Sequence, residues 1–251
     1  MSHFTYHNLI LCNGMKWEIA KANIDFNSPL YAKAVSQAKM KSQFTMDASQ
    51  AGKYRSPRLK YQMQLMGILA EIFAQEYLIE MISNANLSKH WKVIRYDDVR
   101  TDGFKSAANE YDIIIQSVDG SKKYKVESRS SIARDRSLKN AVEQFDIIGP
   151  YSSLAKQGEG FADFFIRPLY EFIPFASEKY LQPDFEKHLK ENQIILHLVA
   201  GCAKKEMIEK GYNKSMKQNG TLYRVVKIAF GFDLEKFSNI LIEGLKQDFL
   251  F

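Results

Sequence analysis

One stretch near the middle of the chain, residues 109–131, constrains the fold most, because its alternation predicts two short paired strands. It reads NEYDIIIQSVDGSKKYKVESRSS, with Asp119 and Gly120 between the two runs. Asp-Gly is favoured in two-residue hairpin loops, where both central residues have positive φ. A hairpin with that loop places Asp112 directly opposite Glu127.

The predicted register sorts the hairpin into an apolar face and a polar face, because side chains alternate along a strand. The apolar face collects Tyr111, Ile113, Ile115, Tyr124 and Val126. The polar face collects Glu110, Asp112, Gln116, Lys123, Lys125, Glu127 and Arg129. Carboxylates held opposite each other repel, so Asp112 and Glu127 would destabilise the sheet. A divalent cation between them would remove that cost.

Length, charge and cysteine usage limit the class of protein. A chain of 251 residues is long enough for one large domain or two small ones. Cys12 and Cys202 lie far apart, and the histidines form no ligand-type cluster, which favours a reducing cytoplasm and no zinc site. We expect no signal peptide and no membrane partner, because no apolar run approaches spanning length. The net charge of +6 favours an anionic partner.

Periodicity predicts a mixed α/β order outside the hairpin. Helices are expected over residues 28–44, 59–82, 137–144, 202–210 and 234–247. Strands are expected over residues 91–96, 145–151, 163–170, 193–199 and 222–230. The helix over 59–82 is the most regular, and on the helix alone Glu71 is expected at an edge that faces water. Residues 49–60 are interpreted as a basic loop.

Three pieces in this order resemble the core of the PD-(D/E)XK nuclease superfamily, and within it the type II restriction endonucleases. They are GILAEIFAQEYL, EYDIII and KYKVESRSS. The resemblance covers roughly residues 59–170. It implies an α/β fold with a restriction-endonuclease-like mixed β-sheet core flanked by α-helices. It also implies a single nuclease domain over residues 1–251, with an N-terminal extension over 1–57 and C-terminal additions over 171–251.

The resemblance implies a metal-dependent endodeoxyribonuclease of prokaryotic origin, most closely a type II restriction enzyme that cuts double-stranded DNA at a specific site. Asp112 and Glu127 would hold Mg²⁺, with Mn²⁺ as an alternative. The backbone carbonyl of Ser128 would be a further ligand, and Glu71 would anchor a second metal or a metal-bound water. Arg129 would complete the catalytic set by contacting the phosphate. A symmetric DNA site implies a homodimer.

Two positions depart from the family pattern and keep alternatives open. Tyr111 stands where the motif often has proline, and Arg129 replaces the motif lysine. Arginine stays charged and cannot act as a base, although it can steer a phosphate oxygen. The alternatives are a catalytically inactive DNA-binding module, a DNA-repair or mobile-element nuclease, and an unrelated basic α/β protein. In the last case Asp112 would face solvent and Glu127 would pair with a neighbouring cation.

Basic residues around the hairpin are candidates for phosphate contacts, which set affinity without carrying sequence information. The candidates are Arg55, Arg58, Arg134, Arg136, Lys139, Lys204, Lys205, Lys214 and Lys217. Residues 213–219, NKSMKQN, have side chains suited to base contacts and are expected to form a loop. Residues 49–60 and 213–219 are also compatible with solvated loops that bind nothing.

Overall fold

A central sheet of eight strands organises the fold, as seen in a computed structural model that describes residues 2–48, 54–105, 111–133, 136–151, 161–173, 184–215 and 222–249. The strand order is β1-β2-β9-β8-β5-β4-β3, and β6 pairs with β8. All neighbours are antiparallel except β5 and β6, which run parallel to β8. The strands are β1 (Phe4–Ile10), β2 (Lys16–Ala22), β3 (Trp91–Arg95), β4 (Ile113–Ser117), β5 (Lys123–Ser128), β6 (Ser131–Ala133), β8 (Phe164–Phe172) and β9 (Ile194–Ala203).

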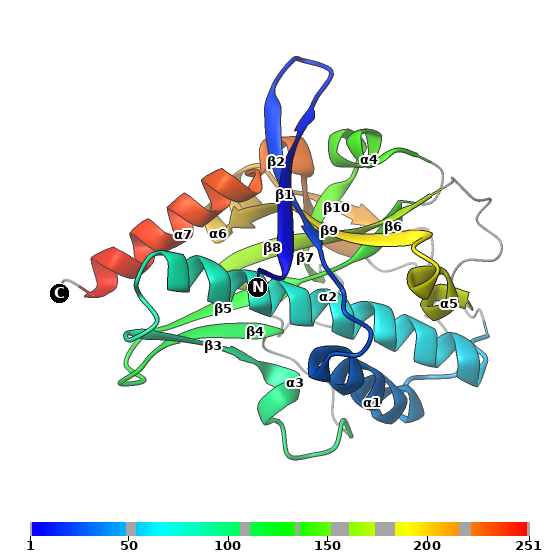
Figure 1. The fold of residues 1–251 in the computed structure, drawn as a ribbon. Helices are drawn as coiled ribbons and strands as arrows, with labels where there is room; N and C mark the ends of the chain where they lie inside the picture. Colours follow the sequence, from blue (N-terminus) through cyan, green and yellow to red (C-terminus); the bar gives the residue numbers. More distant parts are fainter. Residues whose placement is uncertain are drawn as a thin grey trace.

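A second, smaller sheet and seven α-helices surround the central sheet in the described part of the chain (Figure 1). The small antiparallel sheet contains β10 (Tyr212–Ser215), β11 (Leu222–Lys227) and β7 (Asp146–Tyr151), in that order. The helices are α1 (Pro29–Gln43), α2 (Pro57–Asn84), α3 (Tyr96–Val99), α4 (Leu138–Gln144), α5 (Phe185–Lys190), α6 (Lys204–Glu209) and α7 (Leu234–Phe249). No helix within these ranges is long and apolar enough to cross a membrane.

Each face of the central sheet has its own apolar core. On one face, α1, α2, α5 and α7 pack against strand residues such as Ile113, Ile115 and Val126. On the other face, Phe165 and Leu169 of β8 pack with α4, α6 and the small sheet. The fold is therefore mixed α/β, with a mostly antiparallel sheet flanked by helices, and the predicted apolar face of the hairpin is confirmed.

Helix α2 crosses the first face and is buried along most of its length (Figure 1). It begins with Ser56, whose hydroxyl accepts the backbone N–H of Leu59 at 3.2 Å, followed by Pro57 at the first helical position. It ends where Asn86 takes a φ of 59°, and the backbone N–H of Leu87 returns to the Ile82 carbonyl at 2.9 Å. The helix is thus fixed at both ends and holds Glu71 near its middle.

The hairpin keeps the predicted register but has a different loop. Ile113 pairs with Val126 and Ile115 with Tyr124, as predicted. The loop contains four residues, because the Ser117 N–H bonds the Lys122 carbonyl at 3.0 Å. Of the two central residues, only Gly120 has positive φ, so the two-residue loop is wrong. The Asp119 carboxylate instead accepts hydrogen bonds from Ser117 and Ser121, and one extra residue on each side leaves the register unchanged.

Other predicted elements agree within a few residues, with three corrections. Arg58 lies in the first turn of α2 and not in a basic loop. Asn213 lies in strand β10, where a loop was expected, and residues 216–219 lie outside the described ranges. The hairpin β1–β2 was not predicted, although Asn13-Gly14 marks its turn and Gly14 has a φ of 78°.

Candidate functional site

The candidate carboxylates meet at one end of the central sheet, where β4 begins and β5 ends. Asp112 directly precedes β4, and its position continues the register that pairs Ile113 with Val126. Two backbone contacts hold it there: its carbonyl accepts the Tyr96 N–H at 2.9 Å, and its Oδ2 accepts the Ser128 N–H at 2.8 Å. Asp112, just before β4, and Glu127, near the end of the neighbouring strand β5, therefore continue the predicted register.

Burial and mutual repulsion raise the pKa of Asp112. Loss of hydration is the largest cause, followed by the charge of Glu127, while Arg129 and the Ser128 N–H oppose the rise. The result is a pKa of about 6. The site therefore resists holding its full negative charge without a cation.

Glu71 joins this group from α2, and its surroundings differ from the expectation. Its side chain is 15% exposed and forms an ion pair with Arg95 at 3.4 Å, so the prediction of a water-facing edge is wrong. Burial raises the pKa of Glu71 to about 7; Lys41 opposes this, and the charges of Asp112 and Asp97 add to it. Helix and hairpin thus bring Glu71 into the electrostatic range of Asp112.

Arg129 is held on the other side of the pair. Its Nε and Nη2 both contact Glu127 Oε1. Its guanidinium also lies 4.6 Å from the ring centre of Tyr151 and 5.3 Å from that of Tyr223, on strands of the small sheet. Glu127 therefore pairs with a neighbouring cation, as one alternative expects. Asp112 is only partly exposed, which that alternative does not expect.

The donor set suits a hard divalent cation. Asp112, Glu127 and Glu71 offer carboxylate oxygens, and Mg²⁺ usually takes one or two of them while retaining waters. The buried hydroxyl of Ser128, whose N–H bonds Asp112, has no hydrogen-bond partner. Across the described residues, no group of three or more His, Cys, Asp or Glu side chains is arranged to hold a metal. The residues therefore fit a cation held by two carboxylates, completed by backbone or water oxygens.

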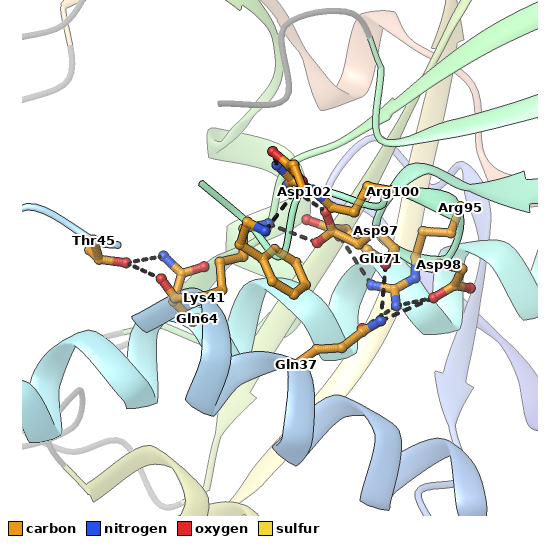
Figure 2. Close-up of polar contacts among 11 residues, drawn as sticks. Gln37, Lys41, Thr45, Gln64, Glu71, Arg95, Asp97, Asp98, Arg100 and Asp102 are labelled. Carbon is orange, nitrogen blue, oxygen red and sulfur yellow. Dashed lines mark hydrogen bonds and ion pairs between the residues drawn. The ribbon is translucent and has the colours of Figure 1, made fainter. Parts of the chain in front are cut away.

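A buried charge network that the sequence did not reveal supports the site from β3, α1 and α3 (Figure 2). Arg95, whose side chain is fully buried, pairs with Asp98 at 2.6 Å as well as with Glu71, and also contacts Gln37 of α1. Lys33 reaches Asp98 from α1 at 2.8 Å. Since Arg95 ends β3 beside Asp112, this network fixes the position of Glu71 relative to the hairpin.

The same network continues toward α1 through Asp97. Lys41 donates to Asp97 Oδ2 at 2.9 Å, and Arg100 reaches Asp97 Oδ1 at 3.2 Å (Figure 2). Arg100 also contacts Asp102 and stacks on the rings of Tyr96 and Phe104. Asp97 directly follows the strand that the sequence predicts over residues 91–96, and no sequence pattern pointed to its partners.

The candidate phosphate contacts are spread over several elements. Lys204 and Lys205 are exposed on α6, while Lys139 of α4 and Arg55 are partly exposed. Three others are engaged: Arg58 pairs with Asp184, Lys214 with Asp146, and Arg136 bonds Gln144 and lies over Phe145. Arg134 and Lys217 lie outside the described residues.

Comparisons with family models, with curated proteins and with solved structures found no match for this chain.

Proposed function

We propose that the chain is a metal-dependent endodeoxyribonuclease with a restriction-endonuclease-like core, most closely a type II restriction enzyme. One observation carries the proposal: Asp112 and Glu127 come together at one end of the sheet in the predicted register, and Glu71 lies within the electrostatic range of Asp112. The raised pKa of Asp112 supports it, because a site that repels its own charge favours a cation.

Asp112 and Glu127 would hold Mg²⁺, with Mn²⁺ as the alternative. The backbone carbonyl of Ser128 would be a further ligand, and Glu71 would anchor a second metal or a metal-bound water. A bound Mg²⁺ supplies an activated water and neutralises charge on the scissile phosphate. Arg129 would place its positive charge beside the phosphate oxygens, and its contact with Glu127 holds it at the edge of the site. Burial of Glu71 and Asp112 keeps bulk water from screening these interactions.

Double-stranded DNA is the proposed substrate. The net charge of +6 favours a polyanion, and exposed Lys204 and Lys205 on α6 are suited to phosphate contacts. A homodimer is proposed because cleavage at a symmetric site needs two copies of the site related by the same symmetry.

A second candidate function is DNA binding without cleavage. The close contact of Arg129 with Glu127 favours it, since a carboxylate that is neutralised by a guanidinium has less need of a metal ion. The two functions share the same DNA surface and differ only in the use of Asp112 and Glu127.

Digestion of plasmid DNA with Mg²⁺, and separately with EDTA, tests the proposal. The wild-type protein should cut with Mg²⁺ only, and discrete fragments would identify a restriction enzyme whereas a smear would identify a non-specific nuclease. The variant Asp112→Asn should bind DNA and fail to cut. If wild type and variant both bind without cutting, the binding module is the correct function. Absence of binding even at low salt would contradict both candidates.

A further inference from the structure

Lys41 is a partly accessible ammonium group beside the candidate carboxylates. It lies in the last turn of α1, its side chain is 27% exposed, and its Nζ is 2.9 Å from Asp97 Oδ2. Burial lowers the pKa of Lys41, but the charges of Glu71, Asp97 and Asp112 outweigh burial, so the pKa is raised. Lys41 therefore stays protonated at neutral pH.

Lys41 reaches the site through Asp97, because the two residues before Asp97 in the chain contact Asp112 and Glu71: the Tyr96 N–H bonds the Asp112 carbonyl at 2.9 Å, and Arg95 pairs with Glu71 at 3.4 Å. In agreement with this geometry, the positive charge of Lys41 opposes the rise in the pKa of both Glu71 and Asp112. Figure 2 shows Lys41 on Asp97 and Glu71 on Arg95, within one network of charges. Lys41 is thus placed to serve the site as well as Asp97.

The other two cations near the site, Arg95 and Arg129, are more buried than Lys41. Arg95 is fully buried, so it can neutralise Glu71 but cannot reach a substrate. Arg129 bonds Glu127 and lies over two tyrosine rings on the opposite flank of Asp112. Of these three cations, Lys41 has the most exposed side chain, at 27% against 21% for Arg129 and 0% for Arg95.

We propose that Lys41 contacts the anionic substrate at the Glu71–Asp112 flank and stabilises charge on a phosphate oxygen. The inference rests on the proposed nuclease function and extends it to a residue of α1, outside the hairpin. An ammonium group on a flexible stem can keep Asp97 as one partner and donate its remaining protons to a phosphate. Burial of the surrounding groups strengthens that contact relative to water.

The substitution Lys41→Met tests the proposal against a matched control on the same helix. Lys33 also joins α1 to α3, through its 2.8 Å ion pair with Asp98. Lys33→Met therefore removes an ion pair between the same two helices, while Asp98 keeps Arg95 as its partner at 2.6 Å and the Arg95–Glu71 pair remains. We expect Lys41→Met to lower kcat about 100-fold, with KM changed less, whereas Lys33→Met stays near wild type. Lys41→Arg, which keeps the charge, should recover part of the loss.

Binding provides a second readout that needs no cleavage. Fluorescence anisotropy of a labelled duplex in EDTA, over a series of salt concentrations, reports the number of phosphate contacts. Loss of one contact lowers the salt-dependence slope by about 0.9, which we expect for Lys41→Met and not for Lys33→Met. Equal effects of the two substitutions, or none, would overturn the role of Lys41 even if wild type cuts DNA. If wild type binds DNA without cutting, the nuclease function is wrong. The salt dependence of binding by Lys41→Met then tests by itself whether Lys41 contacts a phosphate. If wild type does not bind DNA, both proposals are overturned.

Discussion

Replacing Asp112 by asparagine should stabilise the folded protein at neutral pH. The Asn side chain has the same shape and keeps an oxygen that can accept the 2.8 Å hydrogen bond from the Ser128 N–H. It lacks the charge that burial and Glu127 disfavour. A rise in the Asp112 pKa from 3.8 to about 6 corresponds to about 3 kcal/mol of folding free energy at pH 7.

The pH dependence has a defined sign. Between pH 3.8 and about 6 the folded protein binds more protons at Asp112 than the unfolded chain does. Wild-type stability therefore falls as the pH rises through this window, and the loss is complete above it. Asp112→Asn should be more stable than wild type by up to about 3 kcal/mol at pH 7.5, with the difference vanishing near pH 4.

Urea unfolding in EDTA, followed by tryptophan fluorescence and circular dichroism between pH 4 and 8, measures this difference. In a thermal scan the same gain would raise Tm by about 6 to 12 °C for a chain of this length. Asp119→Asn is the control, and it should destabilise the protein at neutral pH. Hydrogen bonds from Ser117 and Ser121 lower the pKa of Asp119 to about 2, so its charged form favours the folded state. A variant at Asp112 that is no more stable than wild type at pH 7.5, or a gain that persists at pH 4, would refute the reasoning.

Three further predictions concern the metal, the buried network and two glycines. Mg²⁺ should raise the Tm of wild type, and more so at higher Mg²⁺ concentration, because it binds the folded protein. The Tm of Asp112→Asn should stay unchanged, and differential scanning fluorimetry measures both. Arg95→Met should cost about 3 to 5 kcal/mol in urea unfolding because Glu71 and Asp98 lose their buried partner, whereas Arg58→Met, at an exposed pair with Asp184, should cost under about 1 kcal/mol. Gly67→Ala should stabilise α2 by about 1 kcal/mol since its Cβ meets nothing within 4 Å, and Gly201→Ala should cost about 1 to 3 kcal/mol because its Cβ collides with the Phe237 ring.

The hairpin register was predictable because alternation and the Asp-Gly signal act locally. A loop of four residues instead of two left the pairing unchanged, since the loop takes one residue from each strand. The starts of α1 and α4 were predictable for the same reason. The helices expected from residues 28 and 137 begin one residue later, after Ser28 and Ser137, each of which accepts a backbone N–H three residues on.

The support of Glu71 could not be predicted, because it depends on partners remote in sequence. A carboxylate within an apolar stretch of helix looks the same whether it faces water or a buried arginine. The partner, Arg95, lies at the end of a strand, and its position follows from the sheet order, which pairs β3 with β4. The place of Lys41 likewise depends on how α1 packs on α2.

The position of Arg129 depends on the small sheet. Tyr151 and Tyr223 come from β7 and β11, which pair although they lie far apart in the chain. Sequence reasoning identified both strands but had no signal for their pairing, so the aromatic contacts of Arg129 were not predicted.

Single-turnover cleavage of a supercoiled plasmid over a Mg²⁺ titration tests most directly whether Asp112 and Glu127 form a metal-dependent cleavage site. We predict that wild-type cleavage rises with Mg²⁺ and saturates, and that Asp112→Asn and Glu127→Gln bind the plasmid equally well but cut it at least about 1,000-fold more slowly. Cleavage by either variant at the wild-type rate, or wild-type cleavage that persists in EDTA, would contradict the account.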